Sequence, residues 1–183
     1  MTRLKPTREK FSIGRMVADL ASENPVVRLT ARESLIDLRL SRVTTALVGE
    51  LVDPREHVRW EAAKALSVLA DPVSAPALVQ ALEDDSEGVR WLAAEGLIAL
   101  GKRGLMAVLS ALTKRASSTT FCRSAHHVLR EFDRGHTAGI IAPVLVALVE
   151  SQPGVSAPVA AYSALVSLKV GNLHNGTSIA SKA

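Results

Sequence analysis

Two stretches of the chain, HVRWEAAKAL at residues 57–66 and GVRWLAAEGL at residues 88–97, share one pattern and stand 31 residues apart. Together they hold both tryptophans of a 183-residue protein. A third stretch, VVRLTARESL at residues 26–35, repeats the Val-Arg, Ala and Leu positions at the same spacing. A fixed period of about 20–50 residues indicates a repeat protein, in which each unit buries its apolar face against its neighbours.

The repeat extends well beyond these three stretches. Weaker copies continue toward the C-terminus, where Ala157, Ala161 and Leu168 take the places of Val58, Ala62 and Leu69. The sequence therefore predicts about five units between residues 11 and 170. Two leucine columns at the 31-residue step are Leu35, Leu66 and Leu97, and Leu38, Leu69 and Leu100.

The sequence pattern of each unit predicts two short helices. In DPREHVRWEAAKALSVL, which begins at Asp53, an N-cap residue is followed by proline and then by Glu56 in the first turn. Apolar residues then recur at spacings of three and four, which gives one buried stripe. After a turn, APALVQAL forms the first helix of the next unit, so each unit is an antiparallel helical hairpin. We therefore predict an all-α fold: an α-solenoid of about five antiparallel helical hairpins with a ~31-residue period.

Composition agrees with a helical protein in a reducing compartment. Hydrophobic residues make up 48% of the chain and aromatic residues 3%, so the core consists mainly of Ala, Leu and Val. The single cysteine, Cys122, excludes an internal disulfide, and the N-terminus lacks a secretory signal. No apolar run is long enough to cross a bilayer. We expect a cytoplasmic protein that does not enter the membrane.

Charge and patterning suggest three segments. Residues 1–10 form a basic N-terminal arm, residues 11–170 a single repeat domain, and residues 171–183 a flexible tail. Residues 50–100 hold ten acidic and four basic residues, whereas residues 102–136 hold seven basic and two acidic residues. Any attraction to an anionic partner is therefore expected at the arm and in the later basic segment.

The motif D-x4-VR-xx-AA-x-AL, present as DPREHVRWEAAKAL and DDSEGVRWLAAEGL, resembles the HEAT-like repeats named after phycobilisome lyases. The resemblance covers nearly the whole chain and is strongest from Asp53 to Leu100. It implies an α-solenoid with the second helix of each hairpin on the concave side. Functions in that family are diverse, so the resemblance informs the fold more than the chemistry.

Three arginines, Arg28, Arg59 and Arg90, occupy the same place in successive units. The resemblance implies that Arg59 and Arg90 bond to loop acids such as Asp53 and Asp84 and join one repeat to the next. The acids recur with the arginines, which favours this structural ladder over an anion-binding site.

The same resemblance predicts which residues face a partner. In such repeats the positions that flank the Val-Arg and Ala-Ala pairs on the second helix point into the concave groove. Carried over position by position, they give the predicted partner-binding residues Leu29, Trp60, Glu61, Lys64, Trp91, Leu92, Glu95, Arg123 and His127.

The two tryptophans are the most specific candidates among these predicted partner-binding residues. Trp60 lies two residues after the core position Val58, about 200° around the helix at ~100° per residue, and so off the packing stripe. Trp60 and Trp91 are predicted to form an aromatic patch on adjacent repeats, which commonly marks a binding surface. The alternative is that each indole packs over the neighbouring helix.

These observations predict a non-catalytic scaffold that holds another protein or peptide in its concave groove, with Trp60 and Trp91 as anchors. No catalytic signature, cofactor or metal site is expected, since Cys122 and His126 supply only two candidate ligands. A bilin lyase-like chromophore-handling protein or enzyme subunit is the alternative function. Nucleic acid is not the expected partner, because the units with tryptophan are acidic. The nearly uncharged last hairpin allows oligomers through the terminal repeats.

Overall fold

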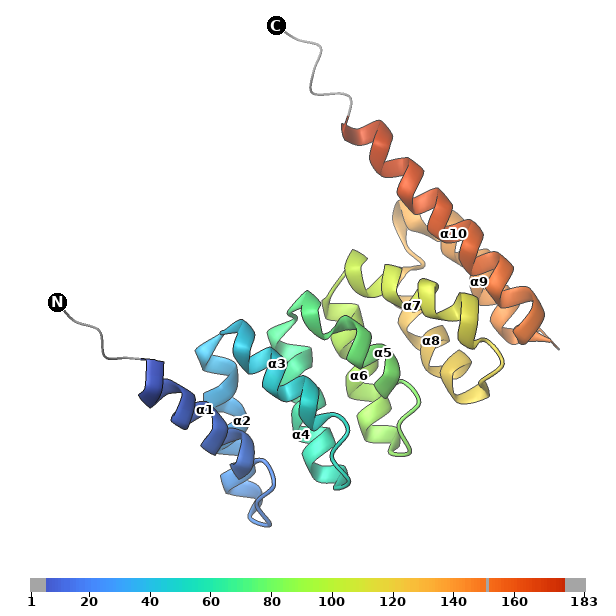
Figure 1. Ribbon diagram of the computed structural model, residues 1–183. Helices are drawn as coiled ribbons and strands as arrows, with labels where there is room; N and C mark the ends of the chain where they lie inside the picture. Colours follow the sequence, from blue (N-terminus) through green and yellow to red (C-terminus); the bar gives the residue numbers. More distant parts are fainter. Residues whose placement is uncertain (1–5, 151, 177–183) are drawn as a thin grey trace, which may run out of the picture. The chain divides into compact units, whose positions relative to one another are not determined.

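The computed structural model describes residues 6–150 and 152–176, and in this part of the chain all regular structure is helical (Figure 1). Two short 3-10 turns, Pro72–Ser74 and Gly135–Thr137, precede α5 and α9. The α-helices pair into five hairpins, so the predicted all-α solenoid is confirmed. They are α1 (Pro6–Asp19), α2 (Pro25–Leu38), α3 (Ser41–Glu50), α4 (Glu56–Leu69), α5 (Ala75–Ala81), α6 (Glu87–Ala99), α7 (Lys102–Arg115), α8 (Thr119–Phe132), α9 (Ala138–Val149) and α10 (Pro153–Gly176).

The end helices reach into the segments predicted as arm and tail. Residues 6–10 belong to α1 and residues 171–176 to α10, while residues 1–5 and 177–183 lie outside the described part. No helix among the described residues is long and apolar enough to cross a membrane.

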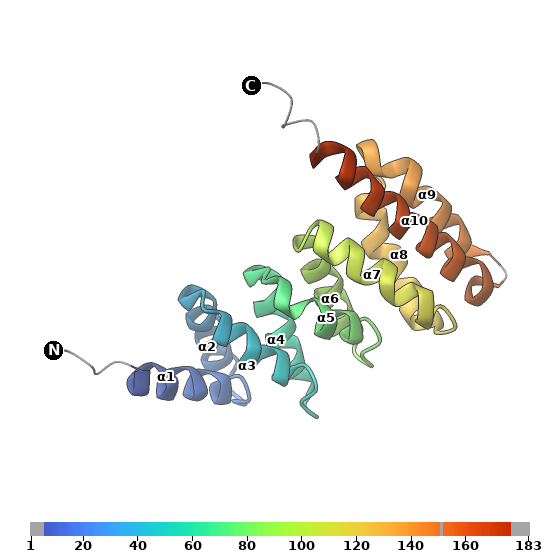
Figure 2. The ribbon, with the colours of Figure 1, turned by 45° about the horizontal axis from the view of Figure 1, so that its top comes forward.

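The chain divides into two compact units after Leu100, and the predicted domain of residues 11–170 contains parts of both. In the first unit, α2 packs on α4 and α4 packs on α6, and each of these helices also contacts the first helix of its own hairpin (Figure 2). Leu35, Leu66 and Leu97 are fully buried at the centres of these helices. The second helices therefore form one continuous layer within the unit.

The second unit is arranged differently. Here α8 contacts α7 and α9, and α10 contacts α9 and α7, so the four helices form a closed ring of contacts (Figure 2). In the first unit the second helices pack on one another, whereas α10, the second helix of the fifth hairpin, packs on α7. The stripe Ala157, Ala161 and Ala164 is buried, as its pattern indicates, and its small side chains allow close packing on α7 and α9.

Second helices in the first unit end in a recurring backbone conformation. Arg39 and Ala70 stand 31 residues apart, and both adopt the left-handed conformation, with φ of 45° and 47°. Gly101, at the next step, also has a positive φ of 57°, but its ψ of −131° lies outside the left-handed helical region. Glycine adopts the left-handed conformation at least steric cost, so the side chains of Arg39 and Ala70 carry strain there.

Replacing Ala70 by glycine is therefore expected to raise the free energy of unfolding by about 0.5–1 kcal/mol. The same change at Ala63, which is buried inside α4, should lower the free energy by at least about 1 kcal/mol. Urea unfolding followed by circular dichroism measures both variants. A destabilised Ala70→Gly variant would contradict the assignment of strain to this position.

Candidate functional site

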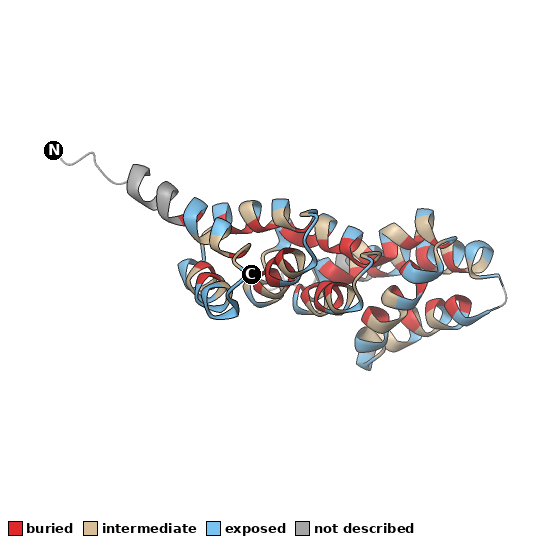
Figure 3. Ribbon diagram, turned by 90° about the horizontal axis from the view of Figure 1, so that it is seen from below, coloured by how far each residue is buried: buried red, intermediate tan, exposed pale blue. Residues whose placement is uncertain are grey.

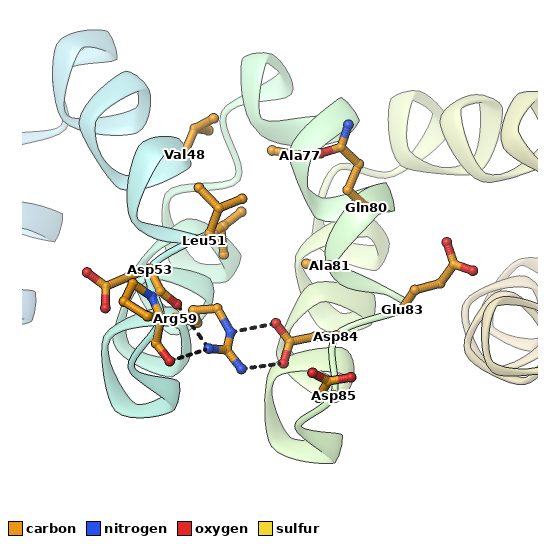
Figure 4. A pocket seen from close by; sticks show the side chains of 12 residues that line it. Val48, Leu51, Asp53, Arg59, Ala77, Gln80, Ala81, Glu83, Asp84 and Asp85 are labelled. Atoms are coloured by element: carbon orange, nitrogen blue, oxygen red, sulfur yellow. Dashed lines mark hydrogen bonds and ion pairs between the residues drawn. The ribbon is translucent and has the colours of Figure 1, made fainter.

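The arginine column joins the repeats of the first unit at one edge of the helix layer. Arg59 donates from Nε and Nη2 to the two carboxylate oxygens of Asp84, at 2.7 and 3.0 Å (Figure 4). Its Nη1 donates to the backbone oxygens of Asp53 and Pro54, at 3.0 and 3.3 Å. Arg59 thus binds its own loop and the next loop together, and hydrogen bonding with Asp84 raises its pKa.

The other two arginines keep the contacts to the backbone of their own loop. Arg90 donates to the backbone oxygens of Asp84 and Asp85, at 2.7 and 3.0 Å. Arg28 donates to those of Ser22 and Glu23 in the same way, at 2.8 and 3.1 Å. The guanidinium groups of all three arginines therefore hold the loops of the fold through hydrogen bonds.

Asp53, predicted as a ladder acid, places its carboxylate on a residue of its own loop. Arg55 donates to this carboxylate from Nε and Nη2, at 2.9 and 2.8 Å, and from its backbone N–H at 2.8 Å. The hydrogen bonds from Arg55 lower the pKa of Asp53 to about 2. Only the backbone oxygen of Asp53 takes part in the ladder, through Arg59.

Two residues predicted to face a partner are buried instead, and that prediction is wrong for both. Glu61 is 6% exposed and forms ion pairs with Arg32 and, at 3.4 Å from Nε, with Arg28. Leu92, at the equivalent place in α6, is also 6% exposed. Both side chains lie on the side of their helix where the preceding second helix packs. Neither is available to a partner in the folded protein.

The two junctions between second helices use different chemistry at equivalent places. Arg32 of α2 occupies the place of Ala63 in α4, and Glu61 of α4 occupies the place of Leu92 in α6. The first junction therefore contains an ion pair between the partly buried Arg32 and the buried Glu61, whereas the second has Ala63 and Leu92 at the same positions. A buried ion pair is tolerated only when both partners are present, because an unpaired buried charge is costly.

Trp60 lies between neighbouring repeats while keeping part of its ring accessible. The guanidinium carbon of Arg32 lies 5.6 Å from the centroid of its ring. On the other side its indole Cδ1 lies 3.2 Å from where a Cβ would stand on Gly88, so the ring packs against the start of α6. Trp60 remains 36% exposed. It combines the two roles that the sequence left as alternatives, packing between repeats and facing solvent.

Trp91 and Leu29 are more accessible than Trp60. Trp91 is 55% exposed and Leu29 is 41% exposed, at the same place in α6 and α2 that Trp60 occupies in α4. Lys64 and Glu95, one turn further along α4 and α6, are half-buried. We call Leu29, Trp60 and Trp91 the apolar column of the first unit. Figure 3 shows that the helices have buried residues on some sides and exposed residues on others.

The remaining predicted partner residues belong to the second unit. Arg123 is exposed and His127 is half-buried, both on α8. Close to them, Cys122 is buried and its thiol donates to the backbone oxygen of Ala116 at 3.2 Å. Burial lowers the pKa of His126. Among the residues that the structure describes, no three His, Cys, Asp or Glu side chains are grouped so that they could hold a metal ion.

An open groove of about 700 Å³ lies between α3 and α5, and the sequence analysis did not predict it. Its walls include Val48, Leu51 and Ala81, and the Arg59–Asp84 pair lies at one end (Figure 4). The groove arises because α3 and α5 pack mainly on the second helices of their own hairpins. Repeat periodicity specifies which residues are buried but not this separation between first helices.

Residues 16–98 match the family model of HEAT repeats. The match supports the HEAT-like prediction for this part of the chain, and it covers the second helices that carry the apolar column. The phycobilisome lyase type stays a prediction. No curated protein matches the sequence significantly.

The contrast between the two junctions gives a stability test. Replacing Glu61 by leucine leaves the partly buried Arg32 without its carboxylate and should lower the free energy of unfolding by about 1–3 kcal/mol. Adding Arg32→Ala recreates the residue pair of the second junction and should restore most of the loss. Denaturant unfolding of both single variants and the double variant measures the coupling. Additive losses would contradict a direct pair.

The Asp53 carboxylate gives a pH test. Its pKa is lowered in the folded protein, so its contribution to stability is present above the unfolded value of 3.8 and is lost as the pH falls through about 2. In the Arg55→Ala variant, the Asp53 carboxyl carbon followed by NMR should titrate at a higher pH than in the wild type. Equal midpoints in the two proteins would exclude Arg55 as the cause.

Proposed function

We propose that the first unit is a non-catalytic scaffold that binds a protein segment across its second helices. The observation that carries the proposal is the apolar column: Leu29, Trp60 and Trp91 are exposed at the equivalent place on α2, α4 and α6, the second helices of three successive hairpins. Large exposed apolar side chains gathered in this way mark interaction surfaces, and tryptophan is enriched among residues that dominate binding energy. HEAT repeats commonly form protein-interaction scaffolds, which supports the proposal.

The geometry of the helix layer suggests what such a segment looks like. Packed helices lie about 8–10 Å apart, so successive members of the column are separated by about that distance. A peptide in the polyproline II conformation advances ~9 Å in three residues and returns to the same side, and an α-helix advances ~10 Å in seven residues. The partner is expected to carry apolar side chains at one of these two spacings.

Trp60 and Trp91 contribute in different ways. The ring of Trp60 is already held by Arg32 and by the backbone at Gly88, so binding costs little additional side-chain entropy. Trp91 has the larger exposed fraction and therefore offers more apolar area for burial. Lys64 and Glu95 lie one turn from these rings, where charged side chains help to set the register of a bound segment.

The charge of this unit favours a protein over a nucleic acid as its partner. Residues 50–100 hold ten acidic and four basic residues, so the helices around both indoles have the same sign of charge as a phosphate backbone. A peptide with basic residues beside its apolar anchors meets no such repulsion.

A peptide-display library selected on the wild-type chain tests the proposal. For a selected peptide, Trp91→Ala should weaken binding by at least about tenfold, and Trp60→Ala should also weaken it. Val73→Ala is the matched control, because Val73 is 62% exposed and lies outside the column. Circular dichroism confirms that each variant is folded. If selected peptides bind both tryptophan variants as tightly as the wild type, the column is not the binding surface.

A further inference from the structure

The helix α10 carries a line of apolar side chains that stay largely exposed among the residues that the structure describes in the second unit. Val155, Val159, Tyr162 and Val166 are 68%, 68%, 65% and 43% exposed. Their spacing of four, three and four residues places them in one line along the helix. The line faces away from the buried stripe centred on Ala161, which packs on α7 and α9. This line is named the α10 ridge below.

The α10 ridge has the residue pattern of a helix-pairing seam. Alternating steps of four and three residues are the repeat by which two helices pack side chains between each other. Residues 153–168 include no charged side chain, so no salt bridge selects a partner of opposite charge. Tyr162 adds a large ring near the middle of the line, where it would be buried most completely.

We propose that the α10 ridge pairs with the α10 ridge of a second copy of this chain, with the two helices antiparallel. A two-fold interface requires a surface that is complementary to itself. The ridge meets this condition because its four residues are symmetric about the midpoint between residues 160 and 161. Val155 of one copy then lies opposite Val166 of the other, and Val159 lies opposite Tyr162.

The next position of the seam decides the direction of pairing. It is occupied by Lys169, which is exposed. In a parallel pair, Lys169 would face its own counterpart, and like charges directly opposite each other are destabilising. In the antiparallel pair, it faces Gln152 of the second copy, which is exposed and neutral. Antiparallel helices also align their dipoles favourably.

The size of the ridge sets the strength of the dimer. A seam of four side chains is smaller than the ~800 Å² per partner that a standard stable interface buries. The dimer is therefore expected to be reversible, with a population that depends on protein concentration. It uses no residue of the apolar column, so it is independent of the proposed binding function.

Sedimentation velocity of the full chain, at concentrations from roughly 1 µM to 1 mM, tests the dimer. The wild type should shift from monomer to dimer, and V159E/Y162E should weaken association by at least ~100-fold, since it places charges in the seam. V52E/V73E is the matched control, because it adds the same charge at exposed valines of the first unit and should associate as the wild type does. A wild type that stays monomeric, or a V159E/Y162E variant that dimerises normally, would overturn the proposal.

Disulfide trapping tests the direction. Antiparallel pairing brings residues 155 and 166 of different copies within disulfide reach, whereas two copies of residue 155 are about 16 Å apart along the axis at 1.5 Å per residue. A mixture of V155C and V166C should form cross-linked dimers under mild oxidation. Neither variant alone, nor the wild type with its buried Cys122, should do so. Efficient cross-linking of V155C with itself would overturn the antiparallel arrangement.

Discussion

Close stacking of the second helices is the constraint on which the first unit depends. Alanine is frequent in α4 and α6, and Ala62, Ala63 and Ala93 are completely buried. A Cβ on Gly96 of α6 would stand 3.5 Å from the Cα of Ser67 in α4 and 2.9 Å from a methyl carbon of Leu78 in α5, so α6 lies close to both helices. Because the helices are this close, the residue that follows each tryptophan in the sequence is buried, and the tryptophan itself lies at the edge of the helix layer. The exposed column is thus a consequence of how the layer packs.

Much of the fold could be predicted from the sequence, because a repeated pattern reports the same burial several times. The column of Leu35, Leu66 and Leu97 identified the core, and it is fully buried. The second unit was harder to predict, since a copy of the repeat pattern identifies a buried stripe but not the helix that covers it. Ala157 and Ala161 are buried as expected, yet they belong to a helix that packs on α7.

The candidate site was predicted in part for a related reason. Helical geometry places Trp60 and Trp91 off the stripe of their own helix, and both are exposed to solvent to different degrees. Glu61 and Leu92 look equally free when one helix is considered alone. Both are buried in the folded protein, and Glu61 pairs with two arginines of the preceding second helix, which a single-helix projection does not include. The sequence did contain a signal that Glu61 is buried. One repeat earlier, Arg32 stands where the next two units have alanine, and an arginine at a packing position requires an acidic partner such as Glu61.

The Arg32–Glu61 ion pair also limits how this protein can change through duplication. Repeats with identical contact residues can be copied, deleted or exchanged, since each new junction resembles the old one. Here an extra copy of the third repeat inserted after the first would place Leu92 against Arg32, and one side of the junction would hold a partly buried charge without a partner. The contact residues of these hairpins therefore determine their order. A repeat can be inserted at this junction only together with a second substitution that removes or pairs the charge.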